Sequence, residues 1–92
     1  MKTYYGTTAE DAAKILQHGF TDGVVRIGGH GMLGVALLGR ITDPTETWLE
    51  VEIDGDLIAP YSVPGVPGEM ALWVVPARLL ADRGSRRLVS CA

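Results

Sequence analysis

Glycine and proline interrupt this chain so often that only short secondary-structure elements fit between them. The sequence contains 12 glycines and 5 prolines in 92 residues, well above the ~12% that the two types together reach in an average protein. Glycine favours turns, and proline cannot continue a helix or a central strand. The spacing of these residues therefore predicts a turn-rich domain in which most elements are short strands.

One segment, from Thr8 to His18, has the features of a helix. Thr8 can cap its start, and Asp11 follows in the capping-box position. Glu10 and Asp11 also complement the positive end of a helix. Gly19 stands where a left-handed residue commonly ends a helix. This pattern predicts one main helix close to the N-terminus.

The remaining apolar segments have the length and composition of strands. They are Lys2 to Gly6, Val24 to Ile27, Val35 to Leu38, Thr47 to Ile53, Glu69 to Val75 and Arg87 to Cys91. In the fourth of them, apolar and acidic positions alternate, which predicts one buried face and one face in water. The two sets are Leu49, Val51 and Ile53 against Glu50 and Glu52. Met70 to Val75 is apolar without alternation, as expected for a central strand covered on both faces.

Two loops and a short helical turn complete the expected chain path. Gly28 to Gly34 is rich in glycine and predicts a flexible loop, whereas Pro60 to Gly68 predicts a stiffer one. Pro76 to Asp82 can form one helical turn. Residues 1–92 are therefore expected to form a single α+β domain, with one main helix and a small mixed, mostly antiparallel split sheet.

Composition and charge exclude several classes of protein. The formal net charge is −3, so there is no electrostatic case for a general nucleic-acid binder or a membrane-surface protein. Cys91 has no second cysteine to pair with, and Lys2 and Thr3 precede any apolar stretch. These features do not indicate a signal peptide or an oxidising compartment, and we expect a cytoplasmic protein. No apolar run approaches the ~18 residues that a membrane span needs.

The common signatures of metal and hydrolase chemistry do not occur in this sequence. There is no zinc-type cysteine spacing, no phosphate loop of the nucleotide-hydrolase type and no recognisable serine–histidine–carboxylate pattern. The Gly28 to Gly34 segment is not a dinucleotide fingerprint, because no helix signal follows it. We therefore expect no metal site.

Three sequence blocks nevertheless occur in an order that is typical of one family. The first is Tyr4-Tyr5-Gly6-Thr7-Thr8, followed by a helix and then Gly19-Phe20. The second is Gly31-Met32-Leu33-Gly34 leading into the strand that ends at Leu38, and the third is Glu69-Met70-Ala71-Leu72-Trp73-Val74-Val75. In this order and spacing, the blocks resemble ADP-ribosyltransferase-fold proteins of the poly(ADP-ribose) polymerase-like kind.

The resemblance implies a pocket for nicotinamide adenine dinucleotide (NAD) between two half-sheets. It implies Glu69 as the catalytic carboxylate, since cleavage of the glycosidic bond develops positive charge on the sugar. It also implies contacts to NAD from Tyr5, Gly6 and Thr7. Tyr5 stands where the family has a histidine, and its hydroxyl can hydrogen-bond a ribose. Leu38 stands where the family has a stacking tyrosine, and leucine offers packing without a π-face.

Two further residues are candidates for ligand contact. His30, in the glycine-rich segment, is placed to approach a phosphate or ribose or else to be simply exposed. Tyr61 can supply the missing stacking ring if its loop folds over the pocket, or it can belong to that loop alone.

Two functions and one mode of assembly follow from these observations. The chain is expected either to transfer ADP-ribose to an unknown acceptor or to be a catalytically inactive member of the fold that binds a nucleotide or a protein. A small domain with 47% hydrophobic residues is also expected to form a homodimer. The interface of this dimer would come from Val63, Val66 and Trp73, or from the strand Arg87 to Cys91.

Overall fold

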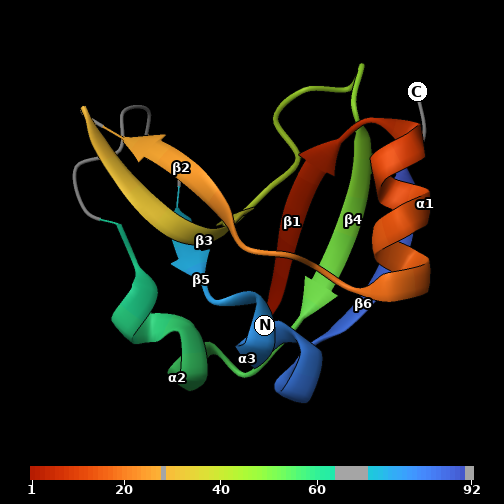
Figure 1. Ribbon diagram of the computed structural model, residues 1–92. Coiled ribbons are helices and arrows are strands. Elements are labelled where there is room, and N and C mark those ends of the chain that lie inside the picture. The colour runs from red at the N-terminus through yellow and green to blue at the C-terminus, as the bar shows by residue number, and fades with distance from the viewer. Residues whose placement is uncertain (28, 64–70, 91–92) are drawn as a thin grey trace.

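The computed structural model describes residues 1–27, 29–63 and 71–90. Along the chain, its elements are β1 (Lys2–Thr7), α1 (Ala9–His18), β2 (Gly23–Ile27), β3 (His30–Leu38), β4 (Thr47–Glu52), α2 (Gly55–Ile58), the 3-10 helix η1 (Ala59–Tyr61), β5 (Leu72–Val75), α3 (Ala77–Arg83) and β6 (Ser85–Ser90) (Figure 1). All strand pairings in the described part of the chain are antiparallel. The predicted α+β class with a mostly antiparallel sheet is confirmed.

The sheet consists of two halves that meet at a narrow junction. Its strand order is β2-β3-β1-β4-β6, and β5 pairs with β3 beside this path. The halves are joined through β1 and β3, whose register contains the single pair Tyr4–Leu38. By contrast, β1 pairs with β4 along its whole length. In Figure 1, α1 lies beside β4 and β6, and the β2–β3 hairpin stands on the other side of β1. This arrangement corresponds to the predicted split sheet.

Helix α1 begins and ends where its capping residues predict. The Thr8 hydroxyl accepts a hydrogen bond from the backbone N–H of Asp11 at 3.2 Å. At the other end, the N–H of Gly19 donates to the carbonyl of Ile15 at 2.8 Å, and the φ of Gly19 is 91°. The predicted helix is therefore confirmed, with both ends satisfied by local contacts.

The core lies where α2 and α3 meet both halves of the sheet. Its buried residues are Val35, Leu37, Val51, Ile53, Ile58, Val75 and Leu80. The apolar face predicted for β4 is buried, and Glu52 is exposed. Glu50 differs from the prediction, because its carboxylate is buried 3.8 Å from Lys2 Nζ and 3.2 Å from Arg87 Nη2. The neighbouring strands β1 and β6 place these two cations beside Glu50. The acidic face of β4 is therefore only partly exposed to solvent.

The prediction of a loop from Gly28 to Gly34 is wrong over most of its length. Residues 30–34 form the first half of β3 and pair with β2, from His30 opposite Ile27 to Gly34 opposite Gly23. The glycine at position 34 serves close packing. A Cβ there would lie 2.9 Å from Val74 Cγ1 and 3.0 Å from the carbonyl oxygen of Val75. A glycine is therefore needed at this position of β3, because β5 passes close to its backbone.

Strand β5 is not central, in contrast to the prediction. It pairs with β3, and an isolated bridge joins Trp73 to Ser62. Leu72, Val74 and Val75 are buried although the strand lies off the main path of the sheet. The first two residues of the predicted strand, Glu69 and Met70, lie outside the described residues.

The remaining predicted segments agree only in part with the structure. The Pro76 to Asp82 turn is the longer helix α3, and the last strand begins two residues earlier than predicted, at Ser85. The sequence did not predict helix α2 or the 3-10 helix η1, and η1 contains Pro60. No helix in the described ranges is both long and apolar enough to cross a membrane.

Candidate functional site

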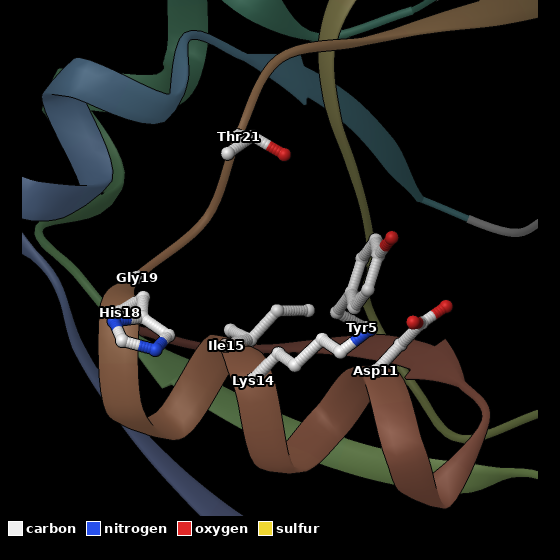
Figure 2. A pocket seen from close by; sticks show the side chains of 7 residues that line it. All are labelled: Tyr5, Asp11, Lys14, Ile15, His18, Gly19 and Thr21. Carbon is white, nitrogen blue, oxygen red and sulfur yellow. The ribbon is translucent and has the colours of Figure 1, made fainter.

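Two adjoining hollows meet at Tyr5 and Thr21, and we call them together the Tyr5 cleft. The helix-side hollow measures about 320 Å³ and is lined by Tyr5, Asp11, Lys14, Ile15, His18, Gly19 and Thr21 (Figure 2). The hairpin-side hollow measures about 260 Å³ and is lined by Tyr5, Thr21, Gly23, Val24, Val25, Gly34, Val35 and Ala36. The cleft therefore lies between α1, β1 and the β2–β3 hairpin, at the junction of the two half-sheets.

Local geometry explains why these side chains share one cleft. Positions 11, 14, 15 and 18 fall on one face of α1, because residues three and four apart lie one above another on a helix. The ring of Tyr5 packs edge-on against Phe20, with 5.2 Å between the ring centroids and an angle of 84° between their planes. Figure 2 shows Lys14 extended along the helix toward Tyr5, and the Tyr5 hydroxyl pointing away from the helix. The aromatic contact thus holds the phenol at the centre of the cleft.

The Tyr5 hydroxyl remains protonated well above neutral pH. Burial of the ring raises the pKa of Tyr5 above its usual value of 10.0, and the carboxylates of Asp11 and Glu46 raise it further. Both effects disfavour a phenolate. At neutral pH the hydroxyl is therefore a neutral group that can donate one hydrogen bond and accept others.

This environment predicts a measurable titration of Tyr5. Ionisation of the Tyr5 phenol changes the ultraviolet absorbance of the protein, and this change is lost in Tyr5→Phe. We expect the midpoint of this change to lie above pH 10.0. Because the pKa is higher in the folded chain than in the unfolded one, the stability that protonated Tyr5 contributes is fully present below pH 10.0 and is lost as the pH rises through the folded value. Difference titration of wild type and Tyr5→Phe measures it, and a midpoint at or below pH 10.0 would contradict the assignment.

A third hollow lies at the end of β1, and we call it the Gly6 hollow. It measures about 490 Å³ and is lined by Gly6, Thr7, Thr8, Ala9, Thr45, Glu46 and Thr47. A Cβ at Gly6 would collide with the carboxylate of Glu46 and would lie 2.8 Å from Trp48 Cη2. Glycine is therefore needed at this position for close packing, whether or not a ligand binds there.

The structure places the predicted site residues in several different regions. Tyr5 lines the Tyr5 cleft, whereas Gly6 and Thr7 line the neighbouring hollow on the same strand. Leu38 is half-buried between its strand partners and lines none of these three hollows. His30 is exposed at the turn end of the β2–β3 hairpin, and Tyr61 is exposed in η1. The predicted catalytic residue Glu69 lies outside the described residues.

Sequence reasoning did not assign most of the polar residues of the Tyr5 cleft to a site. Asp11 was interpreted as a helix-start residue, and Lys14, His18 and Thr21 were not proposed as ligand contacts. The helical spacing of positions 11, 14 and 18 was the available signal, but it also fits an ordinary solvent-exposed face. In the part of the chain that the structure describes, no group of three or more histidine, cysteine, aspartate or glutamate residues is placed to hold a metal ion.

No protein-family model, curated protein or solved structure matches this chain. Its function is therefore argued from the motif resemblance and from the geometry of the Tyr5 cleft.

Proposed function

We propose that this chain is a small ADP-ribosyltransferase-like domain that binds NAD or a related ADP-ribose compound in the Tyr5 cleft. The observation that carries the proposal is the position of the cleft, at the junction of the half-sheets and with Tyr5 of the first sequence block in its wall. The resemblance implies a dinucleotide at such a junction. The two hollows together also fall within the ~300 to 1,000 Å³ that is typical of small-molecule sites.

The chemistry of the lining residues suits the parts of such a ligand. The neutral Tyr5 hydroxyl can donate to a ribose oxygen, as the family's histidine would. Val24, Val25 and Val35 give the hairpin-side hollow an apolar wall, which can pack against a flat ring. The exposed edge of the cleft carries the ammonium group of Lys14 and the imidazole of His18.

In the catalytic form of this proposal, Glu69 acts on the sugar that is attached to nicotinamide. The C–N glycosidic bond breaks, its electron pair leaves with nicotinamide, and the sugar carbon becomes positively charged. The Glu69 carboxylate stabilises this charge. An acceptor oxygen or nitrogen then bonds to the sugar carbon and loses its proton to a base or to solvent.

A non-catalytic binding module is the second candidate, and one observation favours it. Leu38 occupies the position of the family's stacking tyrosine, and it pairs with Tyr4 and Leu72 without lining the Tyr5 cleft. Among the described residues, the position that corresponds to the family's stacking tyrosine then offers no aromatic ring to nicotinamide. A ligand that consists only of the ADP-ribose part would not need that surface.

Calorimetry and a product assay separate these possibilities. Titration with ADP-ribose and with intact NAD tests binding, and nicotinamide release from NAD tests transfer or hydrolysis. Binding with release that falls in Glu69→Gln but not in the matched control Glu52→Gln supports the enzyme. Binding without release supports the module, whereas the absence of binding to either compound would overturn the proposal.

The homodimer and the cytoplasmic location stay predictions. Val63 and Trp73 are half-buried in the monomer, and Val66 lies outside the described residues. On β6, Leu88 and Val89 are exposed. Among the described residues considered for self-association, the exposed apolar side chains therefore lie on the edge strand β6.

A further inference from the structure

The two hollows of the Tyr5 cleft differ in chemistry. The hairpin-side hollow is lined mainly by glycine and apolar side chains, with Thr21 and the Tyr5 hydroxyl as its polar groups. The helix-side hollow contains the charged or ionisable side chains of Asp11, Lys14 and His18. Of the residues that line the cleft, the charged or ionisable ones other than Tyr5 therefore all lie in the helix-side hollow, and a charged part of a ligand would find its partners there.

The arrangement of charge within the helix-side hollow indicates where an anion would bind. Asp11 stands at the Tyr5 end, close enough for its carboxylate to raise the pKa of the phenol. The backbone of Lys14 lies one helical turn further along, its side chain extends back toward Tyr5 in Figure 2, and His18 lies one turn beyond Lys14. A phosphate would be repelled by Asp11 and attracted by Lys14, whereas ribose hydroxyls can donate to the Asp11 carboxylate and accept from Tyr5.

The Lys14 side chain is free to move toward such a ligand. Its one ion pair in the described structure is with Glu10, at 3.6 Å, and the two side chains are 66% and 82% exposed. An exposed pair of this kind contributes little to stability. Lys14 can therefore exchange Glu10 for a phosphate at small cost, and Figure 2 shows its stem already lying along the hollow.

From this arrangement we infer that Lys14 contacts the diphosphate of the ligand, so that the diphosphate lies in the helix-side hollow and a flat ring in the hairpin-side hollow. This inference rests on the proposed function and adds to it an orientation and a residue that selects for phosphate. The ligand class is a nucleoside diphosphate sugar, and an uncharged nucleoside should use only the hairpin-side hollow.

The test compares two ligands and three variants. Binding of ADP-ribose and of adenosine is measured by calorimetry for wild type, Lys14→Met, Lys14→Arg and the control Lys2→Met. Lys2 is a suitable control because it pairs with Glu50 and lines neither hollow. We expect Lys14→Met to weaken ADP-ribose binding roughly fivefold and to leave adenosine binding unchanged, since one charge-assisted contact at an exposed site is lost. Lys14→Arg should bind ADP-ribose nearly as wild type does, because it keeps the charge.

The salt dependence of ADP-ribose binding provides a second readout. It would be the same for wild type and Lys14→Met if Lys14 had only a structural role. Binding of ADP-ribose to wild type should weaken with added salt more steeply than binding to Lys14→Met. If wild type binds ADP-ribose and Lys14→Met binds it equally well, the inference is overturned and the proposed function stands. An equal loss of affinity for both ligands also overturns it, because Lys14 would then shape the cleft without selecting for phosphate. If wild type binds neither ligand, the proposed function itself fails.

Discussion

Replacing Trp48 by alanine is expected to lower the free energy of unfolding by about 3–5 kcal/mol, the usual cost of deleting a large buried aromatic side chain. Trp48 is 1% exposed, and its indole N–H donates to the carbonyl of Asp43 at 2.6 Å. Its ring also packs closely against the backbone of Gly6. A domain of this size has a total stability of only about 5–15 kcal/mol. The substitution should therefore remove a large part of it.

Urea unfolding followed by circular dichroism measures this effect without depending on tryptophan fluorescence. Trp48→Phe should show a smaller loss, because it keeps an aromatic ring but removes the hydrogen bond to Asp43. Leu33→Ala is the matched control, since Leu33 is 71% exposed, and it should change stability by less than about 0.5 kcal/mol. Equal stability of Trp48→Ala and wild type would show that this side chain is not part of the packed structure.

Removing the Tyr5 hydroxyl is expected to weaken the binding of ADP-ribose about three- to tenfold, which corresponds to the loss of one hydrogen bond. Tyr5→Phe makes this change and keeps the edge-on contact with Phe20. Tyr5→Ala should weaken binding further, because the ring lines both hollows of the cleft. Calorimetric titration of both variants with ADP-ribose measures the two contributions separately.

Tyr4→Phe is the control for this prediction. Tyr4 is the adjacent residue of β1, so its side chain points to the opposite face of the sheet, and it lines none of the three hollows described. Its variant should bind ADP-ribose as wild type does. If Tyr5→Phe binds as tightly as wild type while Tyr4→Phe does not, the ligand lies on the other face of β1 and the Tyr5 cleft is not the site.

The elements that could be predicted from sequence were those with local signals. The limits of α1 depend on Thr8 and Gly19, which bond to backbone groups three or four residues away. The alternation in β4 predicted the burial of Leu49, Val51 and Ile53, which is observed. The burial of Glu50 was not predictable in the same way, because its two cations come from β1 and β6, far away in sequence.

The candidate site was predictable only at Tyr5. The sequence block that begins at Tyr4 drew attention to this residue, but its neighbours in the cleft come from α1, the segment that contains Thr21, and the β2–β3 hairpin. His30, which was expected in a loop, either near a ligand or simply exposed, is exposed but is a strand residue at the far end of that hairpin. The error arose because glycine suggested a loop, whereas pairing with β2 imposes a strand on these residues.

The sequence by itself determined the class of the domain, the position and caps of its main helix, and the apolar face of β4, because these depend on periodicity and on contacts within a few residues. Only the tertiary structure decided that β5 lies beside the main path of the sheet, that Gly34 supports the close approach of β3 to β5, and that Tyr5 shares a cleft with Lys14. These features join residues that are distant along the chain, and the energy of such contacts comes from packing and charge placement that no local pattern encodes.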